Sequence, residues 1–380
     1  MPEPTVFSVW LANPNGLPDE NPINDTLYHT IQVIEKFPER KILLEEITGA
    51  WCGYCPRAPI IIAKNILPKY PQVIMVAIHS GDAMAISESN SLRSTYVTGV
   101  PTGFVSRVVV QAGGSVALSP ESWQHNLEKM DLEFNPIELS VYNYYYPDTR
   151  ELKVDVVADF VLDTQGDYRF NCYVIEDSLS GTGSQWNQRN FFNLSASDPY
   201  MELQGAGDPI PGYIHNHVVR KMTGGSWGQE GIIADSVKRG DRYVYSQTFT
   251  LPDHWRIENL HLIGIVQEYN SAPSNRRIVN IKEAELTYAT GTKLLVNLHK
   301  ISLYPNPASE EVWLEVETSE PASFSFEVLN GVGQVILKSD KLSVEGKKFI
   351  KLNTNPWSPG IYFVRTMIGE NIQVKKLIKE

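Results

Sequence analysis

Cysteine is scarce in this chain, with three residues among 380. Cys52 and Cys55 form a C-x-x-C pair, and Cys172 stands alone. Only Cys172 and eight scattered histidines could complete a four-ligand zinc site around the pair, and the sequence has no second C-x-x-C and no H-x-x-x-H. Zinc at this pair is therefore disfavoured, which leaves a redox centre or a structural disulfide.

The chain also lacks an excess of positive charge and lacks long apolar runs. The net charge is −11 and no basic run is present, which argues against a nucleic-acid-binding protein. The longest apolar runs are too short for a helix that crosses a bilayer, so we expect no transmembrane segment. The first residues, "MPEPTVFSVWLANPNGLP", lack the pattern of a signal peptide, which we expect to be absent from this sequence. Proteins or small molecules are the expected partners, and no cofactor is expected.

The length predicts two or three domains. Residues 1–34 are rich in Pro, Asn and Asp, which predicts an extended N-terminal segment, called the lead-in below. Within 35–135 the strand-like runs 41–47 and 72–80 flank a helical stretch at 57–70, which predicts a βαβ unit and an α/β domain.

After a polar helical stretch near 86–95, a further helix is expected to begin near Ser119 and Pro120. Trp123, Leu127 and Met130 fall on one of its faces, which predicts that this face is buried.

From residue 136 the pattern changes to alternating apolar and polar residues. Seven short runs of this kind within 136–290 predict an antiparallel β-sandwich. A long aromatic-rich loop, 177–212, interrupts them, and loops of this length are usually functional or mobile. A third unit, 299–380, again has short alternating strands and predicts a small Ig-like all-β domain.

The first unit resembles thioredoxin over roughly residues 35–133. The resemblance rests on a strand followed by W-C-x-x-C and a helix, then a strand, Val-Pro, a hairpin and a helix. It implies that Cys52 is a nucleophile at the helix N-terminus and that Cys55, one turn inside the helix, resolves the mixed disulfide. Pro101 matches the family's cis-proline, which faces the thiols. Gly and Tyr between the cysteines depart from the usual Gly-Pro, so the direction of electron flow stays open.

Other residues of this unit are expected to assist. Substrate contacts are expected at Trp51, Gly53, Tyr54 and Val100. Glu46 occupies the position of the buried acid that helps deprotonate the resolving cysteine in thioredoxins; alternatively it is a solvated acid, because Glu45 sits beside it.

Five further residues are assigned expected roles. His79 and Asp82, at the end of the second strand, either tune thiol acidity or, as we favour, cap a loop. Cys172 alternates with apolar neighbours and is expected in the core as an inert hydrophobe. His215 and His217 would share one strand face and could bind a metal, but no third ligand is evident, so no metal site is predicted.

Two further resemblances concern the chain as a whole. "LYPNPASEEVWLEV", "VLNGVGQVI" and the final "PGIYFVRTMIGENIQVKKLIKE" are similar to the C-terminal sorting domain of the type IX secretion system. Residues 35–290, through "LLEEITGAWCGYCP", "YVTGVPTGFVSR" and "YIHNHVVRKMTGGSWG", resemble the family of relatives of a twenty-eight-kilodalton outer membrane protein. These resemblances imply passage through the periplasm to the outer membrane surface or the medium, and secretion machinery as a partner of residues 299–380. In such an oxidising location a disulfide would persist.

The leading hypothesis is an exported thiol-disulfide oxidoreductase that acts on thiols or disulfides of other proteins. The alternative is a surface binding or adhesion protein in which Cys52 and Cys55 form a structural disulfide. Shielding of the disulfide by loop 177–212 would favour this alternative. A thiol peroxidase is disfavoured because position 49, three residues before the attacking cysteine, is Gly instead of Thr.

Overall fold

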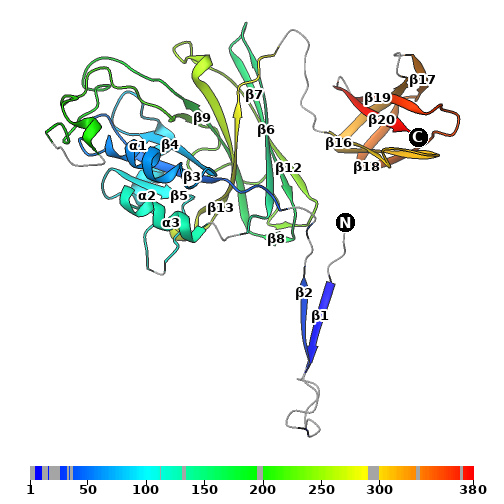
Figure 1. Cartoon of the computed structure of the whole chain (residues 1–380), viewed down its shortest axis with the longest axis horizontal. Coiled ribbons are helices and arrows are strands. Elements are labelled where there is room, and N and C mark those ends of the chain that lie inside the picture. The colour runs from blue at the N-terminus through cyan, green and yellow to red at the C-terminus, as the bar shows by residue number, and fades with distance from the viewer. Residues whose placement is uncertain are drawn as a thin grey trace. The chain divides into compact units, whose positions relative to one another are not determined.

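The computed structural model describes residues 5–10, 16, 26–31, 34, 37–111, 113–130, 134–194, 200–289, 299–330, 334–368 and 371–380. The chain divides into two compact units, Met1–Tyr288 and Ala289–Glu380 (Figure 1). Among the described residues, none of the helices has the length and apolar character needed to cross a membrane.

The described residues of the first unit form strands β1 to β14 and three α-helices. The strands are β1 Thr5–Trp10, β2 Thr26–Ile31, β3 Ile42–Thr48, β4 Val73–His79, β5 Thr102–Val105, β6 Ile137–Tyr146, β7 Glu151–Phe160, β8 Thr164–Gln165, β9 Asp167–Glu176, β10 Val218–Met222, β11 Ser236–Val237, β12 Arg242–Thr250, β13 Leu260–Tyr269 and β14 Arg277–Glu285. The helices are α1 Arg57–Ile61, which continues as a π-helix Ile62–Ile66, α2 Asn90–Tyr96 and α3 Trp123–Met130, with 3₁₀ turns at Ser87–Ser89, Pro120–Ser122, Met201–Leu203, Ile257–Asn259 and Pro273–Asn275.

A mixed seven-stranded sheet is the centre of this unit. Its order is β14-β13-β9-β10-β4-β3-β5. β4 runs parallel to β3 and to β10, and β5 runs antiparallel to β3. The expected β-α-β arrangement of residues 41–80 is therefore present. The sheet also joins strands from both predicted segments, 35–135 and 136–290, and the boundary at residue 135 stays a prediction.

The two faces of β3 pack against different helices. Leu43 and Ile47 belong to a core that includes Leu92 of α2. Leu44 belongs to another core, with residues of α1 and with the α3 residues Trp123, Leu127 and Met130. The buried face predicted for this last helix is confirmed. Because side chains alternate along a strand, Glu45 lies on the α2 side and Glu46 on the α1 side.

The predicted sandwich forms in a different way from the one expected. β12, β7 and β6 make a three-stranded antiparallel sheet. Its apolar side chains, among them Val154 and Val156, pack against Phe170 and Cys172 of β9 and Leu262 of β13. The opposing layer is thus part of the seven-stranded sheet, because β9 and β13 are neighbours in that sheet and β10 connects β9 to β4. Both β9 and β13 are buried on both faces. Cys172 is fully buried, as expected, and burial raises the pKa of its thiol to about 12.

Within the lead-in, β1 and β2 pair as an antiparallel hairpin. The second unit is β-rich, as predicted, and its strands pair in one six-stranded antiparallel sheet around its own apolar core. These strands are β15 His299–Tyr304, β16 Glu311–Leu329, β17 Val335–Lys338, β18 Leu342–Asn353, β19 Gly360–Ile368 and β20 Asn371–Lys379. The 19-residue β16 is longer than the short strands expected in this unit.

Candidate functional site

Cys52 and Cys55 form a disulfide in the connection between β3 and α1, with their Cα atoms 5.4 Å apart. α1 begins only at Arg57, so neither cysteine occupies the helical position expected for it. Both lie in turns that precede the helix, in which Cys55 N donates to Cys52 O and Ala58 N donates to Cys55 O. Pro56 and Pro59 have no N–H to donate, which explains why regular helical bonding starts late.

The disulfide is almost completely buried. Cys52 is 5% exposed and Cys55 is 1% exposed. Residues 188–191 of the long loop, called the covering segment below, contact the backbone of the C-x-x-C turn. The aromatic rings beside the disulfide remain open to solvent, because Trp51 is 47% exposed and Tyr54 is 53% exposed.

The covering segment binds the backbone of the C-x-x-C turn as a peptide ligand would. Arg189 N donates to Ala50 O at 2.7 Å, and Phe191 N donates to Gly53 O at 2.9 Å. The Gln188 side chain donates to Cys52 O at 2.8 Å. Each partner of these bonds lies within or next to the C-x-x-C motif.

The Phe191 ring lies directly on Gly53. A Cβ atom at Gly53 would be 2.4 Å from this ring, so glycine is required for the close approach. Tyr54 packs edge-on against Phe191, with ring centroids 5.0 Å apart. Gly53 and Tyr54, where substrate contacts were expected, thus contact the protein's own loop.

Asp208 holds the covering segment in place. Its carboxylate accepts hydrogen bonds from the Arg189 guanidinium at 2.7 and 3.0 Å and from Asn190 N at 2.9 Å. The Arg189 bonds, followed by the Asn190 bond, lower the Asp208 pKa to about 2. The anchor is therefore ionised throughout the neutral pH range.

Glu46 and Cys55 line the same cavity, which has a volume of about 160 Å³. The Glu46 side chain is nearly inaccessible, at 2% exposure. Burial raises the Glu46 pKa to about 8, and a hydrogen bond with Thr48 opposes the shift only in part. Glu46 is therefore a neutral carboxylic acid at pH 7, and the alternative of a solvated acid is wrong.

Histidine and tyrosine side chains complete the cavity. Tyr213 and His215, which follow the long loop in the sequence, line this cavity. Burial, followed by the nearby His79, lowers the His215 pKa to about 4, although a bond to Trp186 O opposes this. Burial raises the Tyr213 pKa to about 12. The cavity thus contains neutral polar groups at pH 7.

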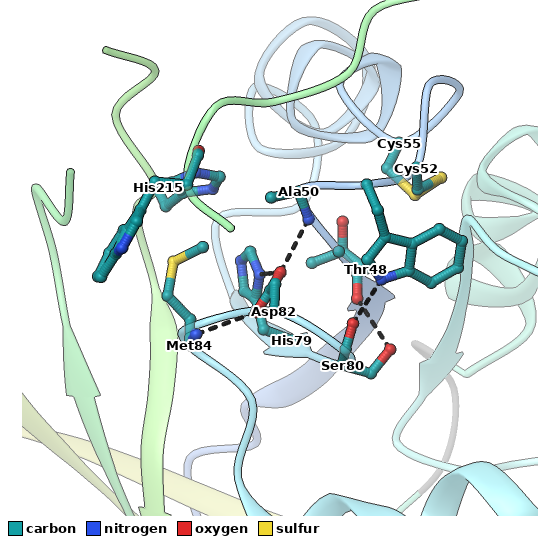
Figure 2. A network of polar contacts seen from close by, with 12 residues as sticks. Thr48, Ala50, Cys52, Cys55, His79, Ser80, Asp82, Met84 and His215 are labelled. Carbon is teal, nitrogen blue, oxygen red and sulfur yellow. Dashed lines mark hydrogen bonds and ion pairs between the residues drawn. A yellow bond between two sulfur atoms is a disulfide. The ribbon is translucent and has the colours of Figure 1, made fainter. Parts of the chain in front are cut away.

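Asp82 ties the end of β4 to the start of the C-x-x-C turn (Figure 2). Its carboxylate contacts His79 Nδ1 at 2.7 Å and accepts hydrogen bonds from Ala50 N at 2.8 Å and Met84 N at 3.0 Å. Burial alone would raise the Asp82 pKa, but these bonds together lower it. The loop-capping role favoured for Asp82 is present, and the cap holds the residue two positions before Cys52.

The end of the sheet that carries the C-x-x-C turn also carries Val100 and Pro101. β5 starts at Thr102, which pairs with Ile47 near the end of β3. The Val100–Pro101 peptide bond is cis, as the resemblance implies. Both residues are half-buried, and Val100 packs on the α2-side core.

The sequence interpretation missed a buried ion pair on the other face of β3. Glu45 is not solvated: its carboxylate accepts two 2.7 Å hydrogen bonds from Arg107 and one from the Tyr173 hydroxyl at 3.0 Å. Both charged side chains are at most 1% exposed. Burial alone would lower the Arg107 pKa, but the Glu45 carboxylate raises it. The available signal was a single arginine within the apolar run that follows Pro101.

His215 and His217 do not share a strand face, which corrects the expectation. β10 begins only at Val218, and His217 has a φ of 57°, so the chain is not extended between the two histidines. His215 instead packs against His79, with ring centroids 5.1 Å apart. His217 lies near His261.

Two family models match the chain. The model described as "Outer membrane protein Omp28" matches residues 89–288, and the model described as "Secretion system C-terminal sorting domain" matches residues 302–380. Together they support export to the outer membrane surface or the extracellular space, and the sorting domain implies interaction with secretion machinery. No curated protein matches the chain.

Solved structures provide a comparison of folds. HBP35 of Porphyromonas gingivalis is 20% identical with a TM-score of 0.52, covering 90% of this chain and 99% of that chain. A protein of Agrobacterium tumefaciens, AGR_C_4864, is 12% identical with a TM-score of 0.37, covering 69% and 99%. A domain of the outer membrane lipoprotein Omp28 from Porphyromonas gingivalis is 16% identical with a TM-score of 0.25, covering 42% and 95%. The first of these shows a shared fold.

The Omp28 match spans more than half of the chain and contains the covering segment and Pro101, whereas the C-x-x-C turn and strands β3 and β4 precede the matched residues. This chain therefore belongs to the Omp28 family of outer membrane proteins and ends in a secretion system sorting domain.

Proposed function

We propose that this protein is an exported, thioredoxin-like thiol-disulfide oxidoreductase of the cell surface, whose reactive disulfide is covered by its own loop. The observation that carries the proposal is the neutral Glu46 acid in the same cavity as Cys55. A structural disulfide has no need of a buried carboxyl group, which lowers stability wherever it must ionise. The order β3, α1, β4, β5 and α3, with Pro101 at the start of β5, supports the thioredoxin-like interpretation.

The reaction starts from the oxidised protein. A substrate thiolate attacks Cys52 Sγ, the Cys52–Cys55 bond breaks, and Cys55 leaves as a thiolate that takes the proton of Glu46. A second substrate thiol, after losing its proton to solvent, attacks the substrate sulfur of the mixed disulfide and releases Cys52. Two electrons pass to the protein, and the substrate gains a disulfide. Another disulfide compound reverses these steps and restores the starting state.

The covering segment must leave before a substrate can reach Cys52. Its backbone N–H groups donate to the carbonyl oxygens of Ala50 and Gly53, which are acceptors that a substrate peptide would use. The segment thus acts as an internal competitor of substrate. Displacement requires the loss of four hydrogen bonds to residues 49–53, among them a 3.4 Å bond from the Gln188 side chain to Gly49 O, and of the Phe191 contact with Gly53.

A second candidate is a surface binding protein in which the disulfide is only structural. Its support is the 5% exposure of Cys52 beneath the covering segment. The two candidates differ in whether the disulfide exchanges with protein thiols in solution.

We expect Cys52→Ser to abolish the acceleration that the wild-type protein gives to oxidation of a reduced model protein in a glutathione buffer, because Cys52 is the sulfur attacked. Cys172→Ser is the matched control and should retain full activity, since Cys172 lies in a closed core. The measurement is the rate at which reduced, unfolded ribonuclease regains activity. Equal rates with wild-type protein, with Cys52→Ser and without protein would assign the disulfide a structural role.

We expect Phe191→Ala to speed reduction of the disulfide by dithiothreitol at least about tenfold, because removing the ring uncovers Gly53 and Cys52. Phe192→Ala is the matched control: its ring contacts Tyr54 and Tyr200. The readout is the appearance of free thiols with time. Equal rates in all three proteins would show that the covering segment does not control access.

A further inference from the structure

A second group of polar side chains lies where three neighbouring strands of the large sheet end. β9 ends at Glu176, which pairs with Leu260 of β13 and with Val218 of β10. Asp177 directly follows β9, His217 directly precedes β10, and His261 is the second residue of β13, opposite Ile175. The sheet therefore brings together one carboxylate and two imidazoles that are separated by up to 84 residues in the sequence.

The donor atoms of these three side chains converge. Asp177 Oδ1 lies 3.3 Å from His217 Nδ1, and Asp177 Oδ2 lies 3.8 Å from His261 Nδ1. One ligand atom from each residue falls within 4.8 Å of the others. An ion with bonds of about 2.0–2.2 Å needs ligand atoms somewhat closer than this, and a small rotation of a half-exposed side chain is sufficient.

One histidine of the cluster also contacts a second carboxylate, as metal-binding histidines usually do. The other ring nitrogen of His261, Nε2, lies 3.4 Å from a Glu283 carboxylate oxygen on β14. A carboxylate in this position fixes the orientation of the imidazole and makes it a stronger ligand. Asp177 and Glu283 together also supply the two negative charges that a divalent ion requires.

His217 is held toward the cluster by its backbone. Its φ of 57° lies in the left-handed region, which a residue with a side chain rarely adopts. His217 N donates to Asp177 Oδ1 at 2.6 Å, and His217 O accepts a bond from Ala77 N at 2.7 Å. This conformation is thus fixed from both sides, with the His217 ring beside Asp177.

Exposure permits entry of an ion. The His261 side chain is 10% exposed and anchors the cluster, whereas Asp177 and His217 are 34% and 41% exposed. We propose that Asp177, His217 and His261 bind a divalent transition-metal ion, with Glu283 orienting His261. Two imidazoles and one carboxylate are typical ligands of zinc in sites that leave a coordination position open. This proposal does not depend on the proposed redox function.

Zinc titration of the full-length protein tests the site. After dialysis against a chelator and its removal, calorimetry with zinc chloride should show one equivalent bound with a dissociation constant of about 10 μM or tighter. His217→Asn and His261→Gln should each weaken binding at least about tenfold. Asn at 217 tolerates the left-handed backbone, and the exposed His125 provides the control variant His125→Gln, which should bind as wild type does.

A spectroscopic measurement on the wild-type protein covers the case of a variant that fails to fold. X-ray absorption at the zinc edge should show two imidazole ligands in the protein loaded with one equivalent. Absence of binding at about 100 μM zinc, undiminished binding in both histidine variants, or fewer than two imidazoles would overturn the proposal.

Discussion

Replacement of Arg107 by methionine is expected to lower the free energy of unfolding of the first unit by about 3–5 kcal/mol. The change leaves the Glu45 carboxylate buried, with the Tyr173 hydroxyl as its remaining partner among the contacts described above. Removing one member of a buried ion pair costs far more than the pair contributes, because the other charge stays desolvated. Guanidinium denaturation of the full chain measures the loss.

Two further variants show whether the uncompensated charge is the cause. Arg242→Met breaks the half-exposed pair of Arg242 with Asp159 and should cost at most about 1 kcal/mol. The double variant Glu45→Gln/Arg107→Met should recover part of the loss, because no charge then remains in the core. A loss in Arg107→Met as small as that in Arg242→Met would contradict the interpretation.

Replacement of Glu46 by glutamine is expected to stabilise the protein at high pH and to have little effect at low pH. The Glu46 pKa is about 8 in the folded protein and near 4.5 in the unfolded chain. Since the folded state holds the proton more tightly, its advantage is complete below the unfolded pKa and is lost as the pH rises through 8. The loss amounts to several kcal/mol, and a neutral glutamine does not suffer it.

The measurement compares denaturation midpoints of wild type and Glu46→Gln at acidic, neutral and alkaline pH. The titratable groups that line the same cavity are His79, Tyr213, His215 and His217, with Cys55 oxidised. These groups are present in both proteins, so the difference between the two midpoints isolates Glu46. A difference that stays constant from pH 5 to pH 9 would show that Glu46 is not a buried neutral acid.

Local patterns predicted much of the fold correctly. The apolar runs around "KILLEEI" and "QVIMVAIHS" correspond to β3 and β4, and the spacing of Trp123, Leu127 and Met130 identified the buried face of α3. These predictions succeed because burial on a strand or helix repeats with a short, fixed period. The position of Glu46 on the α1 side follows from the same alternation along β3.

Long-range pairing was not visible in the sequence. Glu45 binds Arg107, which lies 62 positions away in the sequence. If only one face of β3 were buried, Glu45 would be expected in solvent. The covering segment reaches Ala50 and Gly53 from about 140 positions away through backbone atoms, which leave no signature in side-chain patterns. The joining of β9, β10, β13 and β14 to the α/β strands depends on similar backbone pairing.

The equilibrium reduction potential of the Cys52–Cys55 pair is the most direct test of the central claim that this disulfide is reactive. It is measured in glutathione or dithiothreitol buffers on wild-type protein and on Phe191→Ala, with Cys172→Ser to remove the third thiol. The account predicts a value between about −120 and −270 mV in the range of known exchange proteins. A value below about −300 mV in both proteins would contradict it and identify the pair as a structural disulfide.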